Sequence, residues 1–253
     1  MGRSMVFGGG KMKVKLIDYT KNPLKVLTQA TLVSYWDEWS IDKLDKITEK
    51  DAELHIPRVL GYGHESILEH IKLTFAVEGC SRVCTHQLVR HRHASFVQAS
   101  QRYLKLERDG DIEELFVIPE SIKNDAVLHS KWREILERVM ALYEESIRRG
   151  IPAEDARFIV PQAVRSKIVV SMNMREFKHF IGLRMCERAQ WEIRELAKRM
   201  WEEVYKVDEL KPILKWAKIG PKCIWLGYCP ERELIPPGCW KRQREWWNKV
   251  WSI

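Results

Sequence analysis

The sequence has little of what marks membrane, secreted or disordered chains. Its longest apolar runs are a handful of residues, such as 168–170, whereas a transmembrane helix needs about 20. The N-terminus shows no apolar segment of the kind that a signal peptide carries. The six cysteines have no regular spacing and do not form a disulfide framework. We therefore expect a reduced, cytoplasmic protein with no membrane partner.

Composition and charge exclude disorder but leave the type of partner open. The chain has 253 residues, 45% of them hydrophobic and 31% charged, which is typical of one large globular domain or two small ones. Lys and Arg outnumber Asp and Glu by 43 to 35, giving a net charge of +8. This balance suits nucleic acid, phosphorylated metabolites or an anionic cofactor. A mixed, solvated surface like that of heat-tolerant proteins accounts for most of the charges equally well.

The order of expected elements indicates an α+β protein, with mixed helices around a small, mostly antiparallel sheet. Alternation and β-branched residues predict strands, and periodicity with capping residues predicts helices. We expect Pro57 to break one helix and a polar loop to follow residue 90. The predicted strands are 13–17, 71–78, 115–118 and 166–172, and the main predicted helices are 22–35, 51–60, 81–90, 125–149, a helix capped by Asn173, and 188–206.

The segment 90–103 has the highest density of functional side chains. It contains three arginines, two histidines and two serines within 14 residues. Arginine forks match the geometry of phosphate and carboxylate groups, and serine hydroxyls add donors. A helix C-terminus welcomes one or two cations, but not this many. The segment is therefore predicted to bind an anion, with a solvated basic loop as the alternative.

The segment 63–70 carries two histidines that do not fit a metal site. A zinc-protease helix needs histidines four residues apart, whereas His64 and His70 are six apart. We therefore predict no metal here. His64, which directly follows Gly63, is the better functional candidate of the two.

A third segment, 171–194, places an arginine on an apolar stripe. Helical spacing puts Arg184 beside Phe177 and Ile181. A guanidinium in such a position is costly unless it is paired or holds a ligand. Three roles are compatible with this spacing: an arginine that extends its guanidinium to the surface, a buried ion pair with Glu187 or Glu192, and a ligand contact.

The segment 221–253 differs in composition from the rest. It holds three of the six cysteines and five of the 11 tryptophans, among several Lys and Arg. Interleaved aromatic and basic residues can stack on single-stranded nucleic acid, but packing of the tryptophans on the body or on a neighbouring subunit is favoured. Cys223, Cys229 and Cys239 lack paired C-x-x-C spacing, so no zinc site is predicted.

Together these segments resemble the flavin-dependent thymidylate synthases. Arg90-His91-Arg92 is followed by seven residues and Ser100, with Ser95 and Arg102-Tyr103 also in place. The segment from His64 to His70 is similar to the family element H-x-[ST]-x-x-E-H. The C-terminal signature is matched by Asn173, Arg175, Leu183-Arg184 and Ala189-Gln190-Trp191-Glu192. The likeness spans roughly 13–220, which predicts a flexible extension at 1–11, a catalytic domain at 12–220 and a Trp- and Cys-rich basic extension at 221–253.

The resemblance implies a specific reaction. Family members convert dUMP to dTMP with methylenetetrahydrofolate as carbon donor and FAD, reduced by NADPH, as hydride carrier, without a protein nucleophile. They are homotetramers whose active sites form where subunits meet. By position, the implied FAD contacts are His64, Ser66, Arg90, His91, Arg92, Gln98, Asn173, Arg175 and His179. The implied dUMP contacts are Gln87, Arg90, Ser100, Gln101, Arg102, Arg157 and Arg184, and Arg184 matches the arginine thought to favour ionisation at uracil N3.

One position departs from the family pattern, and two other functions are compatible with the sequence. Many members carry Asn-Glu where this chain has Val97-Gln98, so this chain lacks a carboxylate at that position and its local charge balance differs. A basic nucleic-acid-binding protein is one alternative, although no nucleic-acid fold signature is present. A flavoprotein of other chemistry is the second. Arg175 and His179 are four residues apart and share one face of the predicted helix. Arg184 is nine residues beyond Arg175, and nine steps of 100° leave the two on opposite faces. The helix is therefore expected to serve two active sites, giving Arg175 and His179 to one and Arg184 to another.

Overall fold

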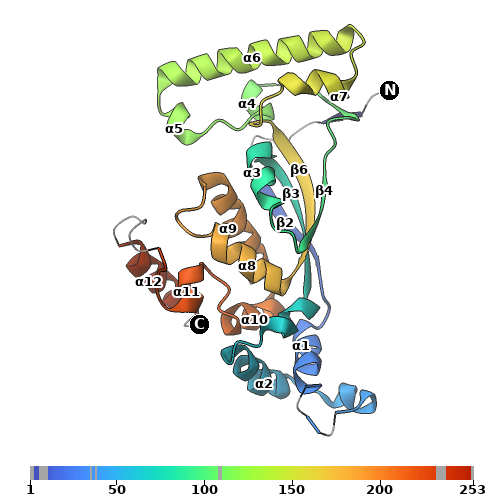
Figure 1. The fold of residues 1–253 in the computed structure, drawn as a ribbon, viewed down its shortest axis with the longest axis vertical. Coiled ribbons are helices and arrows are strands. Elements are labelled where there is room, and N and C mark those ends of the chain that lie inside the picture. The colour runs from blue at the N-terminus through green and yellow to red at the C-terminus, as the bar shows by residue number, and fades with distance from the viewer. Residues whose placement is uncertain are drawn as a thin grey trace. The chain divides into compact units, whose positions relative to one another are not determined.

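The computed structural model describes residues 3–5, 11–34, 36–37, 39–107, 110–231 and 238–251. A four-stranded sheet has the order β2 (Lys13–Tyr19), β3 (Lys72–Ser81), β6 (Arg165–Asn173), β4 (Ala94–Gln98). The sheet is antiparallel and helices surround it (Figure 1), so the predicted α+β class is confirmed. Within the described ranges, no helix has the length and apolar character needed to span a bilayer.

Contacts divide the chain into two units. Unit 1 comprises 1–13, 76–90 and 96–169, and unit 2 comprises 14–75, 91–95 and 170–253. Strands β3, β4 and β6 each contribute residues to both units. The domain boundaries predicted at 12 and 221 are not tested by this division and stay predictions.

Unit 1 is built around the long helix α6 (Ala126–Arg148). Asp125 caps it by accepting hydrogen bonds from the Val127 and Leu128 amides, both at 3.0 Å. Its buried Leu136, Met140 and Tyr143 join the unit's apolar core. The other elements are β1 (Arg3–Met5), which pairs in parallel with β5 (Leu104–Leu106), α3 (Arg82–Leu88), α4 (Ile112–Leu115), α5 (Glu120–Lys123), α7 (Ala153–Ala156) and η3 (Arg157–Ile159).

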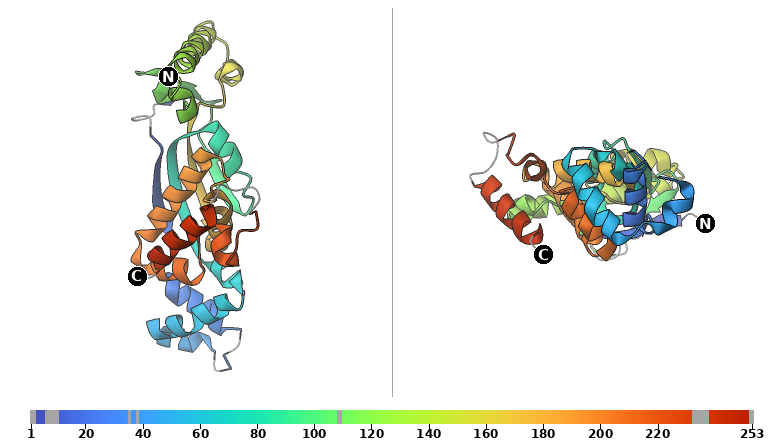
Figure 2. Two further views of the ribbon diagram at one scale, coloured as in Figure 1. Left: turned by 90° about the vertical axis from the view of Figure 1, so that its left-hand side faces the viewer. Right: turned by 90° about the horizontal axis from the view of Figure 1, so that it is seen from below.

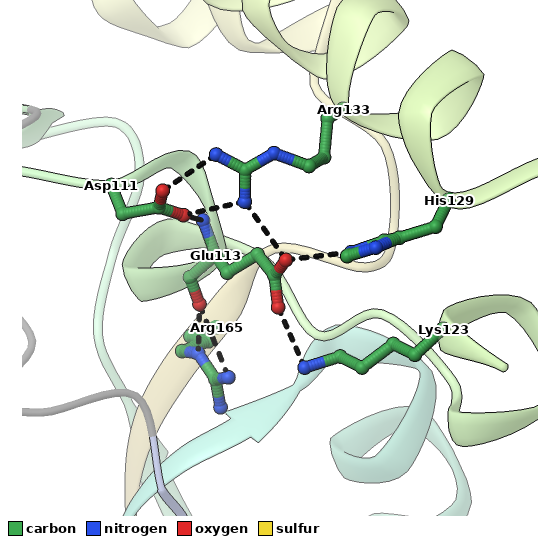
Figure 3. Close-up of polar contacts among 6 residues, drawn as sticks. All are labelled: Asp111, Glu113, Lys123, His129, Arg133 and Arg165. Atoms are coloured by element: carbon green, nitrogen blue, oxygen red, sulfur yellow. Dashed lines mark hydrogen bonds and ion pairs between the residues drawn. The ribbon is translucent and has the colours of Figure 1, made fainter. Parts of the chain in front are cut away.

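A polar cluster joins α4, α5, α6 and β6 within unit 1 (Figure 3). The Glu113 carboxylate contacts Lys123 Nζ at 2.6 Å, His129 Nε2 at 2.7 Å and Arg133 Nη1 at 2.9 Å. The backbone carbonyl of the same residue accepts hydrogen bonds from Arg165 Nε and Nη2 at 3.3 and 3.2 Å. One acidic residue therefore connects four cationic or potentially cationic side chains from three elements.

Unit 2 is mostly helical. Its elements include α1 (Pro23–Leu32) and α2 (Glu49–Gly61), which pack together (Figure 1; blue in Figure 2), and α8 (Met174–Arg184), which packs on α9 (Trp191–Tyr205). Phe177 of α8 stacks on Phe75 with ring centroids 5.8 Å apart. The remaining elements are η1 (Ile41–Lys46), η2 (Glu65–His70), η4 (Asp208–Leu210), α10 (Lys211–Trp216), α11 (Lys222–Leu226) and α12 (Cys239–Trp251).

Three local predictions were wrong. Pro57 lies inside α2 without ending it, because the buried Ala52, Ile56, Val59 and Leu60 anchor both halves of the helix. The predicted strand 115–118 contributes only an isolated bridge between Phe116 and Val164. The polar segment after residue 90 contains β4, which is paired with β6.

Candidate functional site

The first turn of α8 is fixed to η2 inside unit 2. Asn173, as predicted, caps the helix: its Oδ1 accepts the Glu176 amide hydrogen at 2.8 Å. Arg175 Nη1 contacts Glu69 Oε1 at 2.5 Å, an exposed ion pair that joins α8 to η2. Two sequence motifs more than 100 residues apart are therefore in contact.

His64 and Ser66 line a cavity of about 490 Å³ between α1, α2 and η2. Its other polar lining residues are Thr31, Ser34, Arg58 and Tyr62. The Thr31 hydroxyl oxygen is buried without a hydrogen-bond partner among the described residues. Such an atom costs free energy unless something pairs with it. The cavity itself brings the two predicted ligand-binding residues together with Arg58 and Tyr62.

The buried ring of His91 contacts several side chains of α8. Its Nδ1 is 3.1 Å from Glu176 Oε1, and its Nε2 accepts a hydrogen bond from Arg184 Nε at 3.1 Å. The His179 ring lies 5.7 Å away, centroid to centroid, and the Phe180 ring 5.0 Å away. Burial, with the nearby Arg184 and His179, lowers the pKa of His91 to about 4, so that this imidazole is neutral at pH 7.

The sequence left open whether Arg184 forms an ion pair with Glu187 or Glu192 or contacts a ligand. Glu187 is engaged with Arg242 at 3.3 Å and with Gln243 at 3.4 Å. Arg184 and Arg175 have different partners, His91 and Glu69, as their half-turn separation predicts. His179, however, adjoins the same His91 ring as Arg184. These contacts within one chain do not test the expectation that the helix serves two active sites, which stays a prediction.

In unit 1, two predicted substrate-binding arginines converge on one residue. Arg102 Nε contacts the Glu154 carboxylate at 2.7 Å, and Arg157 Nε donates to the Glu154 backbone carbonyl at 3.1 Å. The pKa of Arg82 is lowered mainly by burial and, to a smaller extent, by repulsion from Arg157. The Ser100 hydroxyl accepts the Arg102 amide hydrogen at 3.3 Å. This group combines a local excess of positive charge with hydroxyl and amide groups, as an anion site requires.

Gln98, the position that departs from the family pattern, is held inside unit 1. Its Nε2 donates to Thr85 Oγ1 at 3.0 Å and to Ser166 Oγ at 2.8 Å. A glutamate could not make these two donations, because an ionised carboxylate only accepts. The amide therefore has a structural role that the sequence pattern did not indicate.

The predicted site residues fall into two groups by unit, and their roles as ligands stay predictions. Sequence reasoning missed Glu176, Glu154 and Thr31, because their significance lies in contacts across elements. Unit 2 holds His64, Ser66, His91, Arg92, Asn173, Arg175, His179 and Arg184, and unit 1 holds Gln87, Arg90, Gln98, Ser100, Gln101, Arg102 and Arg157.

Four cysteines line a second cavity in unit 2, of about 310 Å³. They are Cys186, Cys223, Cys229 and Cys239, and all are free thiols. Burial and the neighbouring thiols raise the pKa of Cys223 to about 12. In the part of the chain that is described, no three His, Cys, Asp or Glu side chains are arranged to hold a metal ion.

Tryptophans of the C-terminal segment pack on the rest of unit 2. Trp247 is 1% exposed and meets Trp201 of α9 edge to face, with centroids 5.1 Å apart. Trp225 lies so close to α8 that a Cβ on Gly182 would be 2.0 Å from its ring. Both side chains therefore behave as the packing interpretation predicts, although Trp246 is 44% exposed.

Comparisons with known proteins give a consistent result. The sequence model of the family described as "Thymidylate synthase complementing protein" matches residues 15–208. The flavin-dependent thymidylate synthase of Pyrococcus abyssi is 64% identical over 94% of this chain and 98% of its own length. That of Geobacter sulfurreducens is 40% identical over 87% and 91%. The crystal structure of flavin-dependent thymidylate synthase ThyX from Helicobacter pylori, complexed with FAD and dUMP, has a TM-score of 0.62 and 27% identity, covering 76% of this chain and 93% of that one.

These matches identify the chain as an enzyme rather than a nucleic-acid-binding module. The match to the P. abyssi protein covers 94% of the chain and so includes part of the segment 221–253, which the sequence motifs had left outside the likeness. The chain belongs to the flavin-dependent thymidylate synthase family.

Proposed function

We propose that this protein converts dUMP to dTMP, taking the new carbon from methylenetetrahydrofolate and a hydride from FAD that NADPH has reduced. The family membership and the FAD and dUMP named for the H. pylori structure support this proposal. The observation that carries it is the placement of Arg184, a half-buried guanidinium at the end of α8, against a buried neutral imidazole. Such a cation is suited to stabilise negative charge on a pyrimidine ring.

The residues present fit a bound flavin nucleotide. The cavity beside His64 and Ser66 is also lined by Ser34, Arg58 and Tyr62, whose guanidinium and hydroxyl groups are suited to a ligand that carries phosphate and hydroxyl groups. The residues that would hold FAD are His64, Ser66, Arg90, His91, Arg92, Gln98, Asn173, Arg175 and His179. FAD, when bound and reduced, supplies the hydride. The amide nitrogen of Gln98 is already used inside unit 1, so only its oxygen is suited to a ligand.

The unit 1 arginines are suited to the phosphate of dUMP. Arg102 and Arg157 both reach Glu154 and can present two guanidinium groups to one dianion. The other proposed contacts to dUMP are Gln87, Arg90, Ser100 and Gln101. Arg184 would favour the uracil ring ionised at N3, which makes C5 nucleophilic, so no protein nucleophile is needed.

We also propose that the active enzyme is a homotetramer with shared active sites. The α6 residues Leu128, Ile135 and Leu142 repeat every seven positions, which places them on one helix face. They are 42%, 60% and 48% exposed. A second copy of the chain covering this face would remove apolar surface from water.

Two measurements test the proposed reaction. The purified protein should carry bound flavin, seen as visible absorbance, and should release tritium from C5-labelled dUMP when methylenetetrahydrofolate and NADPH are present. Arg184→Ala should lower that release by about 100-fold or more, the order expected for a group that stabilises developing charge. Arg199→Ala, which alters an exposed pair with Glu195 on α9, is the matched control. A colourless protein, or equal activity in both variants, would reject the proposal.

A further inference from the structure

Glu176 is a buried carboxyl group that the sequence motifs did not single out. It lies on α8 between two proposed FAD contacts and is 6% exposed. Its Oε1 is 3.1 Å from His91 Nδ1. Burying a carboxyl group costs free energy unless it is paired and hydrogen-bonded. The contact with His91 is therefore the feature of Glu176 that needs an explanation.

The donor and acceptor inventory fixes the proton on His91. The guanidinium of Arg184 has only donors, so His91 Nε2, at 3.1 Å from Arg184 Nε, must present a lone pair. A neutral imidazole has one N–H, which then lies on Nδ1 and points at Glu176 Oε1. The three side chains form a directed series, in which Arg184 donates to His91 and His91 donates to Glu176.

We propose that Glu176 is a positioning residue: by accepting the Nδ1–H of His91, it fixes the imidazole tautomer and orientation that hold Arg184 in place for the pyrimidine. This inference rests on the proposed function, in which Arg184 contacts uracil. The same arrangement of an acid that orients an imidazole occurs around metal-bound histidines and in hydrolase triads.

The surroundings of the three side chains agree with this role. His91 is 4% exposed and packs edge to face on Phe180, so its ring cannot turn freely. Burial lowers the pKa of His91, with Arg184 and His179 adding to the effect. Burial raises the pKa of Glu176, while His179 and His93 oppose that rise. Burial therefore keeps His91 neutral, and the assignment of Glu176 as the acceptor rests on the contact between its Oε1 and His91 Nδ1.

A glutamine at position 176 would keep the size and shape of the side chain, but it would no longer force His91 to carry its proton on Nδ1. Its amide can either accept from Nδ1–H or donate to an unprotonated Nδ1. In the second case the proton moves to Nε2, where two donors, His91 Nε2–H and Arg184 Nε–H, would face each other. The hydrogen bond between Arg184 and His91 would then be lost in that fraction of molecules.

The tautomer can be read directly, without substrates, by nitrogen NMR of histidine-labelled protein. His91→Gln identifies the signals that belong to His91. We expect Nδ1 to be protonated and Nε2 unprotonated in the wild type at pH 7, and a shift toward Nε2–H in Glu176→Gln. A wild-type His91 protonated at Nε2, or at both nitrogens, overturns the inference, whatever the enzyme's activity.

The functional consequence is measured by ligand binding. Glu176→Gln should retain its flavin absorbance but bind dUMP about 10-fold more weakly, the loss typical of removing an orienting partner. Glu203→Gln is the matched control, since Glu203 is a half-buried acid of unit 2 that accepts from the Leu16 amide instead. Equal dUMP affinity in wild type and Glu176→Gln refutes the positioning role. If the variant does not fold, the wild-type tautomer still decides.

Discussion

Replacing Glu113 with Gln is the sharpest test of how unit 1 is held together. Partial burial by itself raises the pKa of this carboxyl, but hydrogen bonds from Lys123, His129 and Arg133 outweigh it and bring the pKa down to about 2. From an ordinary value of 4.5, a shift of this size corresponds to about 3 kcal/mol. The side chain is 21% exposed, so solvent screening brings the expected loss to about 2 kcal/mol at pH 7.

The sign of the pH dependence follows from the lowered pKa. Stabilisation by an acid with a depressed folded-state pKa is complete above the unfolded value, here 4.5, and is lost as pH falls through about 2. The difference between wild type and Glu113→Gln should therefore be constant from pH 7 to about 5. By pH 3 less than about half of it should remain.

Denaturation by guanidinium chloride, followed by tryptophan fluorescence at one protein concentration, measures this difference. The control is Glu134→Gln on the same helix, whose exposed pair with Arg138 should contribute no more than about 0.5 kcal/mol. If Glu113→Gln costs no more than the control at pH 7, or if its cost is unchanged at pH 3, the assignment of the cluster as a stabilising centre is wrong.

Two further predictions concern the anion site and the exposed face of α6. Arg102→Ala should raise the Michaelis constant for dUMP at least about 10-fold, since a charge-assisted contact contributes about 1.5–3 kcal/mol. Glu154→Gln should lower the same constant, because it releases Arg102 from its ion pair. Steady-state kinetics in which both variants match the wild type would contradict this prediction. Ile135→Asp combined with Leu142→Asp should reduce the molar mass measured by light scattering. The control is Glu144→Lys, an exposed position on the opposite side of the same helix, and an intact tetramer in the double variant would argue against this face as an interface.

The sequence predicted the elements whose signals are local. Asn173 caps its helix as expected, because its side chain bonds to an amide three residues away, and the longest helix begins close to residue 125 as expected. The strand 94–98 was not expected, because its pairing with β6 depends on a partner about 70 residues distant. Pro57 was misjudged for the same reason, since buried contacts outweighed its local preference.

The site residues differ in the same way, since some have local sequence signals and others depend on contacts distant in the chain. The motifs located His91, Arg175 and Arg184, whose residue types and spacing are distinctive. They did not reveal Glu176, because a glutamate in a helix is ordinary until its burial and its contact with His91 are known. Gln98 shows the converse, since a conspicuous departure in sequence turned out to bridge Thr85 and Ser166.

The contact between Gly182 and Trp225 bears on how this enzyme can be engineered. Even a methyl group at position 182 would overlap the indole, so the proposed catalytic helix is shaped to receive the segment that follows residue 220. An expression fragment cut to the 15–208 match would lack Trp225 and leave α8 uncovered at Gly182. The C-terminal segment should therefore be treated as part of the minimal catalytic unit.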